Sequence, residues 1–194
     1  AHEHYERLIK SCALLGIPFN HTAEELTQIT YLVLEKNNLK DAYIRPLVFC
    51  APNMTLSAPK GVSLMITAWE WKKYFDEQML KVCVSTFQRP NPKSIKMEAK
   101  ACGHYVNSIM ATNEAKQRGF DEALMQDMNG FVAEGPGANF FYEKDGVLYT
   151  PPLGNILPGI TRQTVLEICR ELELPVKEKF FRPEELFEAD SAFL

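Results

Sequence analysis

Lys100 is the residue whose type and neighbours most directly suggest chemistry. It is followed by the small residues Ala101, Cys102 and Gly103, which allow a planar ring to approach the amine closely. An amine in such a place can form a Schiff base with a carbonyl compound and then act as a general acid and base beside an electron sink. The alternative is a solvated surface charge, which is the commoner role of lysine.

Glu134 begins the segment 134–139, in which a carboxylate at the end of a predicted strand precedes two glycines. Glycine permits the backbone to approach a ligand closely. The carboxylate could keep a ring nitrogen protonated, because opposite charges stabilise each other. The alternative is the flank of a hairpin, since a glycine-rich stretch without a phosphate-loop lysine is a weak signal by itself.

The segment 157–162 (Leu-Pro-Gly-Ile-Thr-Arg) opens a predicted helix. The backbone N–H groups of Ile160 and Thr161, the threonine hydroxyl and the helix dipole would together form a phosphate site. Ordinary helix capping would explain the same residues. Arg7, on the first predicted helix, could pair with the same phosphate through two hydrogen bonds, and an exposed helix arginine is the alternative.

Helices and strands in both halves of the chain must position these residues. Apolar residues three and four apart predict helices over these segments: 3–15, 22–37, 103–117, 160–172 and 182–189. Runs of β-branched and aromatic residues predict strands over these: 42–50, 62–68 and 81–87. The turn pairs Asn129-Gly130 and Asp145-Gly146 predict a meander in the second half. The result is an α/β or α+β chain with a smaller first half and a sheet-rich second half.

Individual residues in the first half of the chain predict where its helices begin and end. Gly16 provides a stop for the first helix, and Thr22 with Glu25 forms a predicted capping box at the start of the second. Pro46 must lie at an edge or a bulge of its strand, because it cannot donate a hydrogen bond.

The segment 88–96 is dense in proline and asparagine and predicts a linker between two domains. We therefore expect a small α/β domain over 1–88 and a larger domain over 89–194. The helix after the linker has three apolar residues as a candidate buried side: Val106, Ile109 and Met110.

Composition narrows the class of protein. The 194 residues, 46% of them hydrophobic, can bury a substantial core, and a net charge of −4 gives no basic footprint for nucleic acid or lipid. The first ten residues are not signal-like, and no apolar run approaches the roughly 20 residues that span a bilayer. Five scattered cysteines without a C-x-x-C pair argue against disulfides or a zinc site. We expect a cytoplasmic protein without a metal, whose partners are small molecules.

Three segments, 100–108, 134–139 and 157–162, occur in the order and approximate spacing of branched-chain aminotransferases, and the chain resembles that class IV aminotransferase family. The likeness continues through segments 4–8, 42–46 and 145–152, so it covers practically the whole chain. It implies a two-domain fold-type IV aminotransferase fold, like that of D-amino acid aminotransferase. It also implies a homodimer or a higher homo-oligomer.

The resemblance implies an activity, which is pyridoxal-phosphate-dependent transfer of an amino group between leucine, isoleucine or valine and 2-oxoglutarate. It implies that Lys100 carries the cofactor, that Glu134 binds the pyridine nitrogen and that Tyr105 hydrogen-bonds the phenolic oxygen. The other residues that it implies for the cofactor, at the phosphate or within the same motifs, are Arg7, Asn139, Leu157, Ile160 and Thr161.

Three residues are expected at the substrate. By the resemblance Tyr43 and Arg45 lie toward the substrate, with Arg45 at the side-chain carboxylate when glutamate is the amino donor, and Trp71 lines the apolar pocket. One pocket must accept both a branched chain and glutamate, which needs apolar walls with one reachable cation. Tyr43 and Trp71 are equally ordinary as core aromatics.

The sequence departs from the family in two respects. The family motif after the lysine usually includes Gly-Gly-Asn-Tyr, where this chain has Cys102, Gly103, His104 and Tyr105. We also expect both domains to be incomplete, since the family's first strands and a later Gly-Thr-Ala loop have no counterpart here. Two alternatives remain, namely an aminodeoxychorismate lyase or D-amino acid aminotransferase of the same family, and an inactive fragment or scaffold without a cofactor.

Overall fold

The computed structural model describes residues 1–57, 59–71 and 79–194. The chain divides into two compact units, Ala1–Gln78 and Met79–Leu194. This division comes before the linker that the sequence predicts at 88–96. The reason is that strand β3 (Val82–Val84) pairs in parallel with β4 (Glu122–Gln126), so β3 belongs to the second unit.

The described residues of the first unit form two helices and a hairpin: α1 (His2–Leu14), α2 (Ala23–Lys36), β1 (Tyr43–Cys50) and β2 (Val62–Trp69). The sequence signals that predict the end of α1 and the start of α2 are confirmed. Gly16 follows α1 with φ of +66°, a backbone conformation that glycine adopts without strain. The capping box of α2 is present, because the Thr22 side chain accepts from the Glu25 N–H at 3.2 Å and the Glu25 carboxylate accepts from the Thr22 N–H at 2.9 Å.

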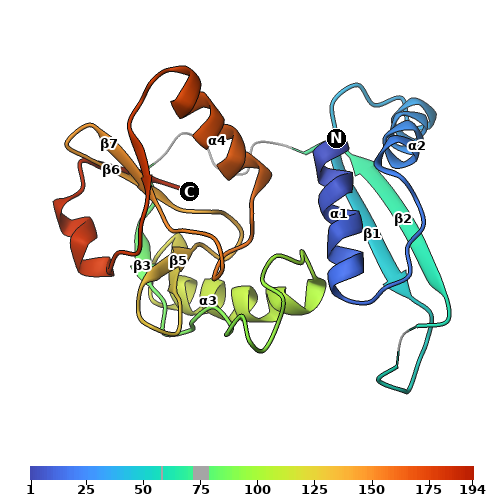
Figure 1. Ribbon diagram of the computed structural model, residues 1–194, viewed down its shortest axis with the longest axis horizontal. Coiled ribbons are helices and arrows are strands. Elements are labelled where there is room, and N and C mark those ends of the chain that lie inside the picture. The colour runs from blue at the N-terminus through green and yellow to red at the C-terminus, as the bar shows by residue number, and fades with distance from the viewer. Residues whose placement is uncertain (58, 72–78) are drawn as a thin grey trace. The chain divides into compact units, whose positions relative to one another are not determined.

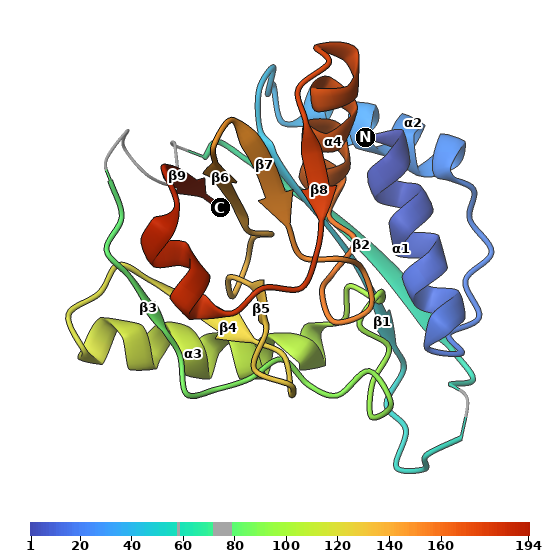
Figure 2. The ribbon, with the colours of Figure 1, turned by 60° about the vertical axis from the view of Figure 1, so that its left-hand side comes forward.

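The hairpin of β1 and β2 has two unlike faces. Side chains alternate across a strand, and on one face Leu64 and Ile66 pack against the buried Tyr5 and Leu26 of the helices. Figures 1 and 2 show α1 and α2 beside the hairpin. Pro46 lies opposite Ile66 in this two-stranded sheet, so its missing N–H is at an edge, as predicted.

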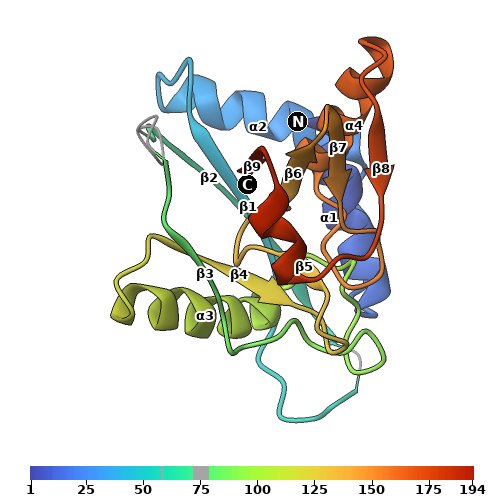
Figure 3. The ribbon, with the colours of Figure 1, turned by 90° about the vertical axis from the view of Figure 1, so that its left-hand side faces the viewer.

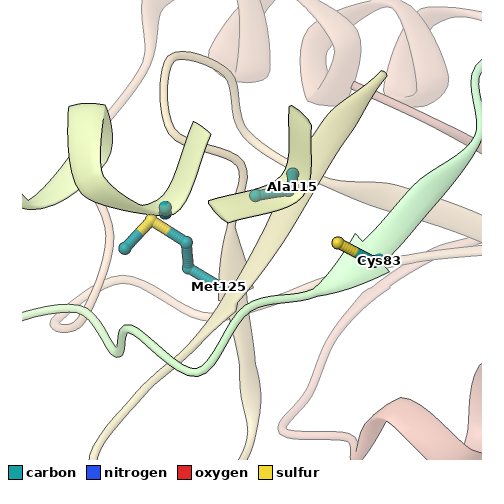
Figure 4. Close-up of a cluster of buried hydrophobic side chains, with 5 residues drawn as sticks. Cys83, Ala115 and Met125 are labelled. Carbon is teal, nitrogen blue, oxygen red and sulfur yellow. The ribbon is translucent and has the colours of Figure 1, made fainter. Parts of the chain in front are cut away.

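The second unit contains two sheets and two α-helices. The first sheet has the order β3-β4-β5, with β5 at Val132–Glu134, and α3 (Tyr105–Gln117) packs on it. Figure 3 shows α3 beside β3 and β4. Figure 4 shows Cys83, Ala115 and Met125 from these three elements within one buried cluster.

The buried side of α3 differs from the prediction. The three expected residues, Val106, Ile109 and Met110, are all exposed in the structure. The buried residues are Ser108, Ala111 and Ala115. Small side chains let the helix backbone approach the sheet closely, and the larger apolar residues are thereby turned away from this core.

The second sheet has the order β8-β7-β6-β9. Its strands and the helices around it are β6 (Phe141–Lys144), β7 (Val147–Thr150), α4 (Ile160–Glu171), β8 (Val176–Glu178), the 3-10 helix η2 (Pro183–Glu188) and β9 (Ser191–Phe193). The hairpins at both predicted turns form, with φ of +51° at Asp145 and +80° at Gly130. The predicted meander is wrong, because the two hairpins belong to different sheets and β7 pairs in parallel with β8.

The fold class is confirmed as mixed α/β with a smaller first half and a sheet-rich second half. The predicted final helix is a 3-10 helix, and β8 and β9 flank it as strands that the sequence did not predict. Within the described ranges, no helix is long and apolar enough to cross a membrane.

Candidate active site

Lys100 lies in a segment without regular structure, just before the 3-10 helix η1 (Cys102–His104) and the start of α3 at Tyr105. Its side chain is exposed, whereas the neighbouring Ala99 is buried. Lys100 Nζ donates a hydrogen bond of 2.8 Å to the Tyr105 hydroxyl. The turn of η1 therefore brings an amine and a phenol together over five residues and holds the amine at a defined position.

His104, which stands where the family usually has asparagine, supports the same turn. Burial and then the positive charge of Arg89 lower the pKa of His104, and a hydrogen bond to the backbone of Ala99 raises it, so that the net effect is a lowered pKa. A mostly neutral imidazole at pH 7 thus contacts the residue immediately before Lys100.

Glu134 ends strand β5 with only 4% of its surface exposed. Its two oxygens accept hydrogen bonds from the Leu157 N–H, at 3.2 Å each, and one accepts from Asn139 Nδ2 at 3.0 Å. Burial raises the pKa of Glu134 to about 7, although Arg89, the Leu157 hydrogen bonds and Lys100 each lower it. The carboxyl group can therefore gain or lose a proton near neutral pH, and its charge responds to the Lys100 amine.

Arg89 is the partner of Glu134 that the sequence did not reveal. Its Nε lies 3.0 Å from Glu134 Oε1, both side chains are less than a tenth exposed, and its Nη1 donates to Ser108 Oγ at 3.2 Å. The signal available in the sequence was weak, namely one arginine at the start of a proline-rich linker. A buried ion pair needs such added hydrogen bonds to offset the loss of water.

Asn139 and Leu157 join the glycine-rich loop to the segment before α4. Asn139 Nδ2 donates to the Leu157 carbonyl at 2.9 Å as well as to Glu134. Gly159 is required here for space, since a Cβ atom on it would lie 2.0 Å from Asn139 Oδ1. The two motifs therefore form one hydrogen-bonded structure around Glu134.

Helix α4 begins at Ile160 after Gly159, which has no side chain to cap it. The N–H groups of the first helical turn have no intrahelical partners, so the start of a helix favours an anion. Arg162 is 5% exposed and anchors this end, because its Nη2 donates to the Pro151 carbonyl at 2.9 Å and to Glu178 at 2.6 Å. Ile160 and the exposed Thr161 are thus held at a fixed helix start.

The remaining predicted site residues belong to the first unit. Arg7 lies on α1, partly buried. Tyr43, Arg45 and Trp71 lie on or beside the hairpin, with the Tyr43 and Trp71 ring centroids 5.2 Å apart. The structure therefore groups the predicted residues into two sets, one in each unit.

Among the described residues, no group of three or more histidine, cysteine, aspartate or glutamate side chains could hold a metal ion. Cys102 is an exposed free thiol, and the other cysteines are also unpaired.

The family model described as Amino-transferase class IV matches residues 1–194. The chain belongs to this family of aminotransferases, and its fold is fold-type IV. The branched-chain-amino-acid aminotransferase of Escherichia coli K12 is 38% identical over 200 residues, which cover 99% of this chain and 65% of that protein. The chain therefore spans just under two thirds of the length of this curated relative.

Solved structures agree with this assignment. A branched-chain aminotransferase from Thermoproteus uzoniensis, solved with norvaline, superposes with a TM-score of 0.95 at 40% identity, covering 99% of this chain and 66% of that one. The enzyme of the same name from Thermobaculum terrenum, solved in its PLP form, has a TM-score of 0.93 at 33% identity, with 100% and 65% covered.

Proposed function

We propose that this chain is part of a pyridoxal-phosphate-dependent branched-chain aminotransferase, which transfers an amino group between leucine, isoleucine or valine and 2-oxoglutarate. The observation that carries the proposal is the exposed Lys100 amine, which donates a hydrogen bond of 2.8 Å to the Tyr105 hydroxyl. The charge of this amine also lowers the pKa of the buried Glu134 carboxyl group, which is about 7. Relatives at 38% and 40% identity bear the name of this activity.

The residues present fit the cofactor. Pyridoxal phosphate, when bound, supplies an aldehyde that joins to an amine, and a protonated ring that withdraws electrons from the substrate. Lys100 is the attachment point in this proposal, Tyr105 is the partner of the phenolic oxygen, and Glu134 is the partner of the ring nitrogen. Asn139 and Leu157 hold Glu134 in place through the hydrogen bonds already described.

Lys100 would transfer protons, and Tyr105 would orient its amine. The Lys100 amino group, when not attached to the cofactor, would be the base that takes a proton from the substrate carbon bearing the amino group. The hydrogen bond to the Tyr105 hydroxyl orients the lysine amine, and an oriented base transfers a proton more readily than a randomly placed one.

Glu134 would hold a proton at the ring nitrogen. A buried carboxyl group with a pKa of about 7 is half ionised near neutral pH, and a cationic ring in contact with it would favour its charged form. Arg89 acts in the same direction, because its guanidinium stabilises the carboxylate and keeps it oriented.

The phosphate would lie at the start of α4. Ile160 and Thr161 offer backbone N–H groups and a hydroxyl at a helix N-terminus, which is a favourable place for a dianion. Arg7 is also proposed as a phosphate ligand, and this role rests on the resemblance to the family. For the substrate, Tyr43 and Trp71 would supply apolar contact and Arg45 the cation for a second carboxylate.

The test uses the protein as its gene encodes it, loaded with pyridoxal phosphate. Borohydride reduction followed by peptide mass spectrometry should find a pyridoxyl group on Lys100, and turnover of leucine with 2-oxoglutarate should give glutamate. Pyruvate release from aminodeoxychorismate, or transamination of D-alanine, with no turnover of leucine would point to a related enzyme. The absence of any pyridoxyl group would support a scaffold without a cofactor.

We also propose that the enzyme is a homodimer or a larger homo-oligomer that works in the cytoplasm. The resemblance to the family supports the first part, and the unpaired cysteines are in keeping with the second. Size-exclusion chromatography with light scattering would test the assembly, and a monomeric mass at micromolar concentration would contradict it.

A further inference from the structure

The open face of the β1–β2 hairpin carries a group of aromatic side chains around one cation. Tyr43 and Trp69 are directly opposite each other in the strand register, and their ring centroids are 4.9 Å apart. Trp71 extends the group, with its centroid 5.9 Å from that of Trp69. This face is the one that does not contribute to the buried cluster of the first unit.

Arg45 contacts two of these rings. Its guanidinium carbon is 5.4 Å from the Tyr43 ring centroid and 5.5 Å from that of Trp69. Both distances are within the range of a cation–π interaction. The Arg45 side chain is nevertheless exposed, so contact with the rings leaves part of it accessible to a ligand.

Contact with the rings lowers the entropy that the Arg45 side chain loses when a ligand binds. A free arginine side chain loses roughly 2 kcal/mol of rotamer entropy when it is fixed. Contact with two rings fixes part of that freedom before any ligand arrives. Aromatic rings interact with the face of a guanidinium, whereas a carboxylate is bound by the N–H groups at its edge. The rings can therefore hold Arg45 without occupying the donors that a carboxylate needs.

We infer that Trp69 is a positioning residue for specificity, which holds the Arg45 guanidinium for the second carboxylate of a dicarboxylate substrate and has little part in binding branched apolar substrates. This inference rests on the proposed function. Trp69 is better placed for this role than for filling a core, because it ends β2 on the open face of the hairpin. Its contacts with Tyr43 and Trp71 hold its own ring.

The experiment compares Trp69→Leu and Trp69→Phe with the wild-type protein, each in the length that its gene encodes and loaded with cofactor. We expect Trp69→Leu to raise KM for 2-oxoglutarate about fivefold, since one exposed cation–π contact is lost. KM for leucine and kcat should change less than about twofold. Trp69→Phe keeps a ring and should stay within about twofold of the wild type in both KM values.

Calorimetry provides a measurement that does not depend on turnover. Glutarate has two carboxylates and no reacting group, and 4-methylpentanoate has one carboxylate and a branched chain. Trp69→Leu should raise Kd for glutarate about fivefold and leave Kd for 4-methylpentanoate within about twofold. If the wild-type protein does not turn over leucine, the proposed function fails, and the calorimetric comparison still decides the role of Trp69.

The matched control is Phe49→Leu. Phe49 is an exposed aromatic on the same face of β1, opposite Ser63, four residues and thus about 13 Å along the strand from Arg45. It should change neither Kd by more than about twofold. If Trp69→Leu does not fold, Trp69→Met replaces it, because methionine fills space without a ring. Equal effects on both ligands, no effect on either, or no glutarate binding by the wild type would overturn the inference.

Discussion

Arg45 in the first unit and Glu134 in the second show two different ways in which this protein holds a charge. Arg45 is exposed, and its guanidinium lies against two aromatic rings. Glu134 is buried, and its hydrogen bonds and an ion pair surround both oxygens. The surroundings of Arg45 affect only where its charge lies. The surroundings of Glu134 also affect whether its carboxyl group is ionised.

The difference follows from the loss of water. An exposed guanidinium keeps its proton under all ordinary conditions, because it is a very weak acid. A buried carboxylate loses most of its hydration, which is why the pKa of Glu134 rises to about 7 despite the nearby Arg89. We therefore expect substitutions in the second unit to change chemistry and stability, and substitutions in the first to change affinity.

The largest effect is expected at Lys100. Lys100→Ala removes the amine that attaches the cofactor and transfers protons, so kcat for leucine with 2-oxoglutarate should fall at least about 1000-fold. Lys93→Ala is the matched control, since Lys93 is an exposed lysine in the segment before it. Full activity of the Lys100 variant would contradict its catalytic role.

The next effect concerns Glu134 and pH in the cofactor-free protein. Its pKa is about 7 in the folded chain against an ordinary value of 4.5, so the folded state binds more protons between these values. The contribution of Glu134 to the free energy of unfolding should therefore be greatest below about pH 4.5 and fall by about 3 kcal/mol as the pH rises to about 7. Denaturant unfolding at pH 4.5 and 8 measures it.

Glu134→Gln is the control for this measurement, because it keeps the shape of the side chain and removes the titrating group. The variant should lack that part of the pH dependence. If the wild type and the variant show the same change in stability between the two pH values, burial does not raise the Glu134 pKa in solution.

A smaller effect is expected at Gly159. A Cβ atom there would lie 2.0 Å from Asn139 Oδ1, so Gly159→Ala should move Asn139 away from Glu134 and lower stability by about 2 kcal/mol. Gly137→Ala, in the glycine-rich loop that carries Asn139, serves as the control, since a Cβ there meets nothing within 4 Å. Thermal unfolding of both variants compares them, and equal melting temperatures would show that the loop adapts.

The smallest of these four effects is expected at Arg7, in the first unit. Arg7→Ala removes one charge-assisted contact to the cofactor phosphate in our proposal, so Kd for pyridoxal phosphate should rise about tenfold while kcat at saturating cofactor stays nearly unchanged. Absorbance titration of the cofactor measures it. A loss of kcat at full saturation would mean that the first unit affects the chemistry as well.

Much of the fold could be predicted from local patterns. The capping box at Thr22, the stop at Gly16 and the hairpin turn at Asp145-Gly146 all depend on a few neighbouring residues, and all are present. The buried side of α3 could not be predicted in this way. Its outcome depended on the partner sheet, where small residues such as Ala111 and Ala115 allow closer packing than the larger apolar ones.

In the candidate site, too, some features could be predicted from the sequence and others could not. The sequence by itself determined the motifs around Lys100, Glu134 and Ile160, because their residue types and order resemble one family throughout. Only the tertiary structure decided that Arg89 faces Glu134 and that Trp69 lies over Arg45. Both pairs join residues more than twenty positions apart, and contact over such a distance depends on strand pairing and burial, which no local pattern encodes.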